Sequence, residues 1–258
     1  MSIKLQLQQH RNQLITFVLI CILLALWEIV VFVQQIPVYI LPAPRQILMT
    51  LLNNLDYFTK ALQVTMFEAG TGLILGTISG VLLASLISLR PNLESGVMTL
   101  AVFVKSMPLV AIAPLLTIWL GFGVGPKIIL TAMLTFFPVL INVVSGLNRA
   151  DAALLDTLHS WDANRWEVFR YIRIPSALPY LFAALKISGP LSLIGAVVAE
   201  WTGASQGLGK AMWLAYSNLN MPYLFAAIFM LTIVGQLLYV LILWCEQRIV
   251  FWQPLIEV

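Results

Sequence analysis

The chain has 258 residues, of which 60% are hydrophobic and 10% are charged, and its mean hydropathy is +0.94. A soluble domain of this length would carry charged residues over its whole surface, so the composition excludes one and predicts a polytopic, all-α membrane protein. The net charge of +3 reflects lysine and arginine in the loops and requires no nucleic-acid partner.

Six apolar runs are long enough to cross a bilayer, for which a helix needs about 20 residues. They predict about six transmembrane helices in a single domain over residues 1–258. The first run is expected to remain in the protein, because Gln34 and Gln35 follow it without the small residues of a signal-peptide cleavage site. The runs cover residues 14–33, 61–89, 96–120, 128–147, 180–201 and 223–250.

A short amphipathic helix is predicted between the first two runs, in residues 34–60. Two prolines in LPAPRQIL precede it, and such a helix would lie at the external face of the membrane as scaffolding. Its apolar residues follow a helical period and are Ile47, Leu48, Leu51, Leu52 and Leu55.

Small residues form a stripe on each of two predicted helices. Both stripes are typical of faces that let a neighbouring backbone approach closely. The alternative for the second stripe is a sliding face or one that lines a pathway. The first stripe is Gly72, Gly76, Gly80 and Ala84, and the second is Ser188, Ser192, Gly195 and Ala199.

Charged residues and prolines inside the apolar runs are candidates for a translocation pathway, because a charge at such a depth usually faces protein or water. The alternative for Lys105 and Lys186 is that their side chains extend to the cytoplasmic headgroups. For Glu200 the alternative is an anchor at the external interface, together with Trp201. The candidates are Lys105, Pro108, Lys186, Ser188, Ser192 and Glu200, with Glu68 beside them.

Residues 148–178 form the only extended polar stretch between long apolar runs. Asp151 is placed to cap a helix that carries Leu158 and Trp161 on one face. A second amphipathic stretch, RWEVFRYIRIP, follows and is expected to stop at Pro175. Such apolar faces suit insertion into a groove on a soluble partner. The alternative, a loop whose arginines bind phospholipid headgroups, leaves the acidic residues of this stretch unexplained.

The distribution of positive charge predicts the orientation of the chain. The positive-inside rule places the N-terminus and residues 148–178 in the cytoplasm, because that side then has the excess of lysine and arginine. The cytoplasmic set is Lys4, Arg11, Arg90, Arg149, Arg165, Arg170, Arg173 and Arg248, and the external set is Arg45, Lys60, Lys127 and Lys210.

The segment from Asp156 to Pro175 resembles the cytoplasmic coupling loop of permease subunits of binding-protein-dependent ABC importers. The family's pattern is Glu-Ala-Ala, three residues, Gly, nine residues, Ile, one residue and Leu-Pro. Aspartate at the glycine position is tolerable, since short polar side chains adopt left-handed conformations more readily than most. The pattern falls without gaps on Asp156, Thr157, Leu158, Asp162, Ile172, Ile174 and Pro175, which with Trp161 are the residues expected to couple to an ATPase.

Longer segments are similar to permeases for sulfonates, taurine, nitrate and thiamine-related pyrimidines. The resemblance implies the type I ABC importer permease fold, a pair of permeases in a bacterial inner membrane, a separate ABC ATPase subunit and an external substrate-binding protein. It further implies a hydroxymethylpyrimidine or another thiamine precursor as cargo, with sulfonate, taurine, nitrate, bicarbonate or riboflavin as alternatives. These segments are LPAPRQIL, MPLVAIAPLLTIWLGFGVGPKI, FFPVLIN and AEWTGASQGLGKAM.

The sequence predicts neither an enzyme nor a cofactor or metal site on this chain. The stretch ASQGLGKA lacks the first glycine and the final Ser/Thr of a phosphate-binding loop. Cys21, Cys245 and the two histidines have no companions at metal-ligand spacing. An ion-coupled secondary transporter is the rival class, but it often shows inverted repeats and would not need the helix within residues 148–178.

Overall fold

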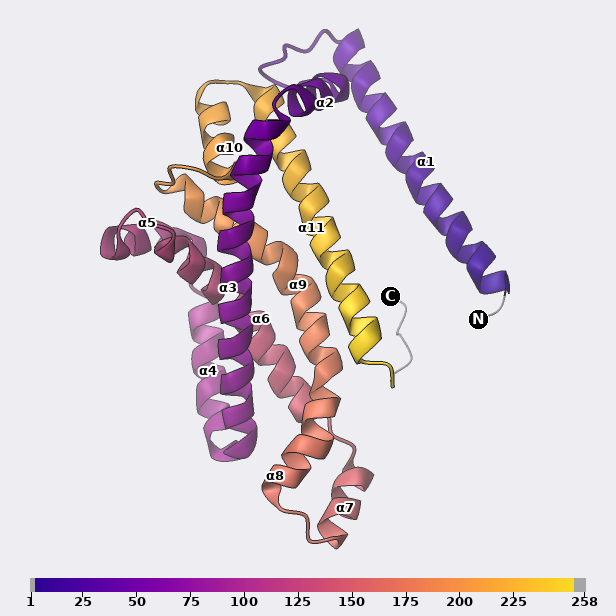
Figure 1. The fold of residues 1–258 in the computed structure, drawn as a ribbon, viewed down its shortest axis with the longest axis vertical. Coiled ribbons are helices and arrows are strands. Elements are labelled where there is room, and N and C mark those ends of the chain that lie inside the picture. The colour runs from indigo at the N-terminus through magenta and orange to yellow at the C-terminus, as the bar shows by residue number, and fades with distance from the viewer. Residues whose placement is uncertain (1–2, 253–258) are drawn as a thin grey trace. The chain divides into compact units, whose positions relative to one another are not determined.

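The computed structural model describes residues 3–252, and every regular element in that range is helical, as the composition predicts (Figure 1). The elements are α1 (Ile3–Val33), α2 (Pro44–Asn53), α3 (Leu55–Leu89), η1 (Pro91–Leu93), α4 (Glu94–Lys105), α5 (Leu109–Leu120), α6 (Gly125–Leu147), α7 (Ala152–Ser160), α8 (Arg165–Val168), the π-helical turn η2 (Phe169–Arg173), α9 (Ile174–Trp201), α10 (Leu208–Ser217) and α11 (Met221–Ile249).

Within residues 3–252, five helices are long and apolar enough to span a membrane, and α4 and α5 together make a sixth. The predicted spans are therefore confirmed, although the third is two helices bent by 86° rather than one run over residues 96–120. Pro108 explains the break. It has no N–H to donate, and its ψ of 82° lies outside the helical region.

Contacts divide the chain into two compact units. The first comprises residues 3–58 with Ala211–Phe229, and the second comprises Thr59–Lys210 with residues 230–252. That the whole chain acts as a single domain, as the sequence predicts, stays a prediction.

Aromatic contacts join the separate segments of the first unit. The Trp27 ring lies 5.8 Å from that of Phe225 and 6.3 Å from that of Phe229, centroid to centroid. The Tyr223 hydroxyl donates to the side-chain oxygen of Asn54. The helix predicted in residues 34–60 is present as α2, and its Ile47 is 3% exposed. The predicted apolar face is only partly covered, because Leu48 and Leu52 are 56% and 60% exposed and Leu55 belongs to α3.

The second unit is built around α3, α6 and α9, and the glycine stripe of α3 faces α6 along its length. A Cβ atom on Gly72 would overlap Thr131, one on Gly76 would overlap Thr135, and one on Gly80 would press on Val139. Backbones this close require residues without a side chain at those positions. The interpretation of the first stripe as a packing seam is confirmed.

The second stripe is also enclosed by protein. Ser188 and Ser192 of α9 are fully buried, and a Cβ on Gly195 would meet Leu134 of α6. A pathway along this face would require α9 to separate from its neighbours. The role of Ser188 and Ser192 in lining a pathway stays a prediction.

Candidate functional site

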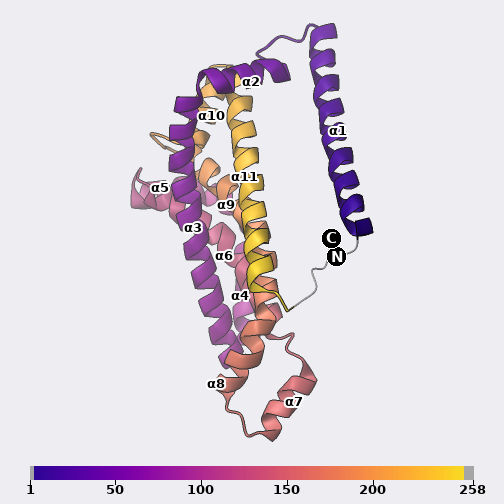
Figure 2. The same ribbon diagram turned by 45° about the vertical axis from the view of Figure 1, so that its right-hand side comes forward.

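The segment between α6 and α9 begins with a capped helix. The Asp151 carboxylate accepts a hydrogen bond of 2.9 Å from the Ala153 amide, which supports the first turn of α7 as the sequence predicts. Figures 1 and 2 both place α7 and α8 at one end of α6 and α9, away from the body of that bundle. On α7 the side chain of Leu154 is 53% exposed, and Trp161 just after it is 75% exposed. A helix with an uncovered apolar face therefore protrudes from the bundle.

The turn after α7 takes the form that the family's glycine requires. Asp162 has φ = +53°, the left-handed region that a short polar residue tolerates. The Trp161 and Ala163 amides both donate to the Leu158 carbonyl oxygen, at 3.1 Å each. The expectation that Asp162 accommodates this conformation is confirmed.

A second cap, which the sequence analysis did not identify, starts α8. The Asn164 side chain accepts hydrogen bonds from the Trp166 and Glu167 amides at 3.0 Å, and the Glu167 carboxylate accepts one from the Asn164 amide at 2.7 Å. This reciprocal arrangement is a capping box, and the signal for it is the spacing Asn-x-x-Glu. Caps at the starts of α7 and α8 fix the direction in which each helix leaves its turn.

The prediction that the helical pattern stops at Pro175 is wrong. The chain continues from α8 through the π turn η2 directly into α9. Pro175 falls in the first turn of α9, where a missing N–H costs least, and a local π turn can satisfy the freed backbone groups. Residues 165–173, here called the coupling segment, are consequently continuous with the membrane helix α9.

The apolar face of this second stretch points inward, contrary to the expectation that its apolar residues would all face a partner. Phe169 and Ile172 are 5% and 8% exposed, and Phe169 belongs to the core around α3 and α6. Trp166 is the exception, being 57% exposed while its ring lies 5.6 Å from that of Phe169. The apolar surface left free for a partner is therefore mainly that of α7 and Trp161.

The predicted coupling residues fall into two groups. Asp156, Thr157, Trp161 and Asp162 are exposed and Leu158 is partly buried, whereas Ile172 is packed against the chain's own core. Ile174 is 39% exposed and Pro175 is partly buried at the start of α9. No metal-ligating cluster of three His, Cys, Asp or Glu side chains occurs among the described residues.

The pathway candidates Lys105, Pro108 and Lys186 do not share one environment. Lys105 and Pro108 are exposed at the break between α4 and α5. Lys186 donates to both carboxylate oxygens of Glu246, at 3.1 and 2.9 Å. This ion pair, between residues 60 positions apart, was not predicted. Glu246 therefore pairs with the Lys186 ammonium group inside the protein, in place of the alternative contact with lipid headgroups.

Glu200 is buried and holds the start of α10. Its carboxylate accepts hydrogen bonds from the Thr65 hydroxyl at 2.6 Å, the Gly209 amide at 2.5 Å and the Lys210 amide at 3.3 Å. Because Glu200 has no exposed surface, the alternative that it anchors the chain at the membrane interface is wrong. Its carboxylate occupies the space that a Cβ on Gly207 would need, and Gly207 takes φ = +118° there.

A second buried charge lies on the same helix as Thr65. Glu68 forms an ion pair of 3.1 Å with Lys127 of α6, and both side chains are almost completely enclosed. Placed in an external loop by the sequence analysis, Lys127 instead lies in the first turn of a membrane helix. Charges that deep are stable in apolar surroundings only when paired.

A family model, related sequences and solved structures all match ABC importer permeases. Residues 72–251 match the family described as binding-protein-dependent transport system inner membrane component. A probable ABC transporter permease of Haemophilus influenzae is 32% identical over 230 residues, covering 89% of this chain and 94% of that protein. The formylaminopyrimidine transport permease ThiX of Halalkalibacterium halodurans is 32% identical over 232 residues, covering 90% and 92%.

Further matches cover less of the chain or are more distant. The riboflavin transport system permease RibX of Chloroflexus aurantiacus is 35% identical over 149 residues, covering 58% of this chain and 56% of that protein. A solved amino acid ABC transporter has a TM-score of 0.64 at 15% identity, covering 78% and 98%. The MetNI methionine ABC transporter has a TM-score of 0.57 at 21% identity, covering 76% and 94%. These two structures confirm the type I permease fold.

Proposed function

Because the chain belongs to the family of binding-protein-dependent transport system inner membrane components, we propose that its α7 helix and Trp161 dock on the separate ATPase subunit and transmit nucleotide-driven movement to α9. The protein is a multi-pass membrane permease of an ABC importer and catalyses no reaction itself. ATP is hydrolysed on the partner ATPase, and an external binding protein delivers the solute.

The observation that carries this proposal is the uncovered apolar face of α7 and its turn. Leu154 on α7 and Trp161 in the turn after it are mostly exposed. Asp151 caps the start of α7, and Asn164 caps α8 on the other side of this turn. Neighbouring exposed apolar side chains outside the membrane spans indicate an interaction surface, and an amphipathic helix seated in a groove is a common mode of recognition. Continuity of η2 with α9 supplies a mechanical link from the docked helix to the membrane.

Leu158→Asp tests the docking face. It places a carboxylate on the face proposed to enter the ATPase, so the variant should insert normally while ATP hydrolysis and uptake become uncoupled. Leu219→Asp, in the exposed turn before α11, controls for adding a carboxylate away from the proposed docking face. Normal uptake by Leu158→Asp would count against docking through α7.

We further propose that the cargo is a small pyrimidine of the thiamine-precursor class. The support is the 32% identity to a formylaminopyrimidine permease over 90% of this chain. Riboflavin is the second candidate, because the similarity to its permease is 35% but extends over only 58% of this chain. Titration of the cognate external binding protein with formylaminopyrimidine, hydroxymethylpyrimidine and riboflavin separates the two. Tight binding of a sulfonate alone would contradict both.

The remaining parts of the proposal concern assembly. Residues 1–258 act as one permease domain, pair with a second copy of the chain, hold no cofactor and place the N-terminus in the cytoplasm. The excess of lysine and arginine on that side supports the orientation. An impermeant thiol reagent applied to intact cells should therefore fail to label Trp161→Cys, and efficient labelling would reverse the topology. An ion gradient driving uptake by the chain alone would instead favour a secondary transporter.

A further inference from the structure

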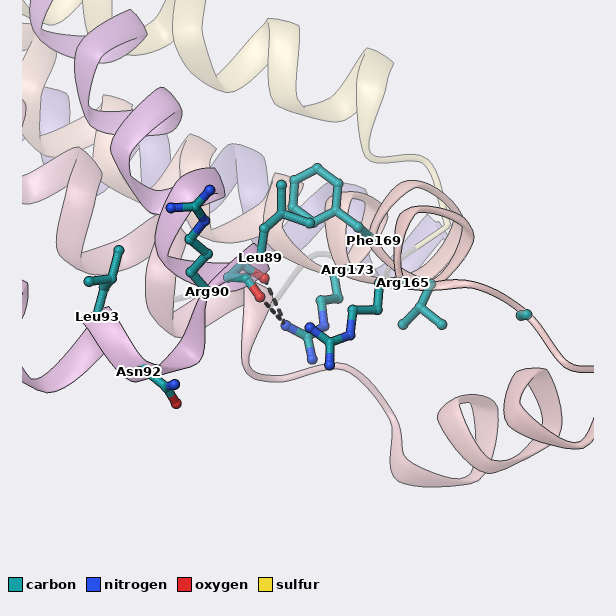
Figure 3. Close-up of a pocket in the computed structure, with 10 residues that line it drawn as sticks. Leu89, Arg90, Asn92, Leu93, Arg165, Phe169 and Arg173 are labelled. Atoms are coloured by element: carbon teal, nitrogen blue, oxygen red, sulfur yellow. Dashed lines mark hydrogen bonds between the residues drawn. The ribbon is translucent and has the colours of Figure 1, made fainter.

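A basic pocket lies where α3 and the α8–η2 segment leave the helix bundle. It has a volume of about 630 Å³, and its lining includes Arg90, Arg165 and Arg173 but no carboxylate (Figure 3). The apolar part of the wall comes from Leu89, Leu93, Val168 and Phe169.

Only one of the three arginines has a partner among the described residues, and that partner is neutral. Arg173 donates through Nη1 to the Ser88 carbonyl oxygen at 3.1 Å and to the Ser88 hydroxyl at 2.8 Å, which ties η2 to the end of α3. Arg90 and Arg165 are exposed at the pocket, and neither forms an ion pair within residues 3–252.

Three acidic residues adjoin pocket-lining residues in sequence, and Asp162, which is exposed in the turn after α7, does not line the pocket. The other two are otherwise engaged. Glu94 accepts a hydrogen bond from the Asn148 side chain at 2.8 Å, and Glu167 closes the α8 cap. Neither of them lines the pocket. Like charges that share a cavity give it a positive potential, and this potential favours an anion from outside the chain.

The chemistry of the wall selects the kind of anion. Guanidinium groups match the geometry of a phosphate and bind it through paired hydrogen bonds. The apolar residues on the same wall suit a molecule that carries hydrocarbon next to its phosphate.

The pocket lies at the ends of two membrane spans, so the surrounding lipid can supply such a molecule. The pocket is formed by the last turn of one candidate span, Leu55–Leu89, and by the first residues of another, Arg165–Trp201. On the second of these, Trp166 and Tyr171 are 57% and 67% exposed, as is usual at the level of the headgroups. Basic pockets between membrane helices bind the headgroups of anionic lipids such as cardiolipin.

We propose that this pocket binds the phosphate of an anionic phospholipid headgroup and thereby holds the coupling segment against the end of α3. Figure 3 shows the Arg165 side chain beside that of Arg173, whereas the Arg90 side chain extends away from both. The phosphate would therefore lie at Arg165 and Arg173, and Arg90 would add positive charge at the same wall. The inference depends on the position of the chain in a membrane and not on docking of α7 to an ATPase.

Binding of cardiolipin to the purified full-length chain tests the proposal. The chain is placed in zwitterionic lipid nanodiscs, and the amount of bound cardiolipin is measured by native mass spectrometry. Each arginine near a lipid surface strengthens binding about fivefold, so the double variant Arg90→Gln/Arg165→Gln should bind cardiolipin about 25-fold more weakly. The matched control is Arg149→Gln/Arg170→Gln, which removes the same charge from exposed arginines outside the pocket.

Several outcomes would overturn the proposal. They are an equal loss in the control pair, unchanged cardiolipin binding in the pocket variant, and saturation of the pocket by inorganic phosphate with no preference for lipid. Loss of ATPase assembly with cardiolipin binding intact would assign the arginines to a protein contact instead. Should the double variant unfold, Arg165→Lys keeps the charge but loses the paired hydrogen bonds, and a several-fold weaker affinity is then the expected result.

Discussion

Replacing Glu200 with alanine should destabilise the second unit more than any exposed substitution, because one carboxylate there satisfies several buried donors. Without it the Gly209 and Lys210 amides lose their acceptor at the start of α10. The Thr65 hydroxyl loses less, since the Ala61 carbonyl oxygen lies 3.3 Å from it. The cost is therefore set mainly by the two backbone N–H groups.

The magnitude follows from those two groups. An unsatisfied buried donor costs about 1–3 kcal/mol, and a carboxylate at a helix N-terminus contributes about 0.3–1 kcal/mol more. Glu200→Ala should thus lower the free energy of unfolding by about 2–7 kcal/mol. Glu200→Gln keeps one oxygen for the two amides and loses the charge and the oxygen that accepts from Thr65, whose hydroxyl still has the Ala61 carbonyl oxygen. Its cost should therefore stay at about 1 kcal/mol.

Titration of the purified chain from mild detergent into dodecyl sulfate, followed by circular dichroism, measures these differences. Glu94→Ala is the control, because Glu94 accepts one hydrogen bond from Asn148 at a more open site. If Glu200→Ala and Glu94→Ala have equal effects, or if Glu200→Gln is as damaging as Glu200→Ala, the assignment of Glu200 as the cap of α10 is refuted.

Two further predictions concern contacts inside the second unit. Gly76→Leu should prevent folding, because even a Cβ there overlaps Thr135, whereas Gly70→Ala should be nearly neutral since nothing lies within 4 Å of its Cβ; equal yields of folded protein would contradict the α3–α6 seam. Lys186→Met should slow transport by leaving the Glu246 carboxylate unpaired, and the additional change Glu246→Gln should restore it; if the second change has no effect, the ion pair is not what Lys186 contributes.

Features that depend on composition over one segment could be predicted from the sequence. The spans follow from the length of the apolar runs, and the cap at Asp151 follows from its place before a helical pattern. The left-handed backbone at Asp162 follows from alignment with a glycine in the family's pattern. In each case the determining residues lie within a few positions of the feature.

Features that depend on two distant segments could not be predicted. The Lys186–Glu246 and Lys127–Glu68 ion pairs join different helices, and a single sequence contains no signal that such residues meet. Glu200 illustrates the same limit, because its partner Thr65 lies 135 positions away on another helix. The pattern of RWEVFRYIRIP was identified as amphipathic, but a period alone does not say whether the apolar face meets a partner or the chain's own core.

Site-specific crosslinking tests the central claim, that α7 and its turn meet the ATPase, most directly. With Cys21 and Cys245 replaced by serine, Trp161→Cys in the assembled transporter should crosslink to the ATPase subunit, with a yield that changes when nucleotide binds. Trp119→Cys on α5 is the control, since Trp119 is 70% exposed and Trp161 is 75% exposed. A crosslink from position 161 alone is the predicted result, and no crosslink from 161, or equal crosslinking from both positions, would contradict the account.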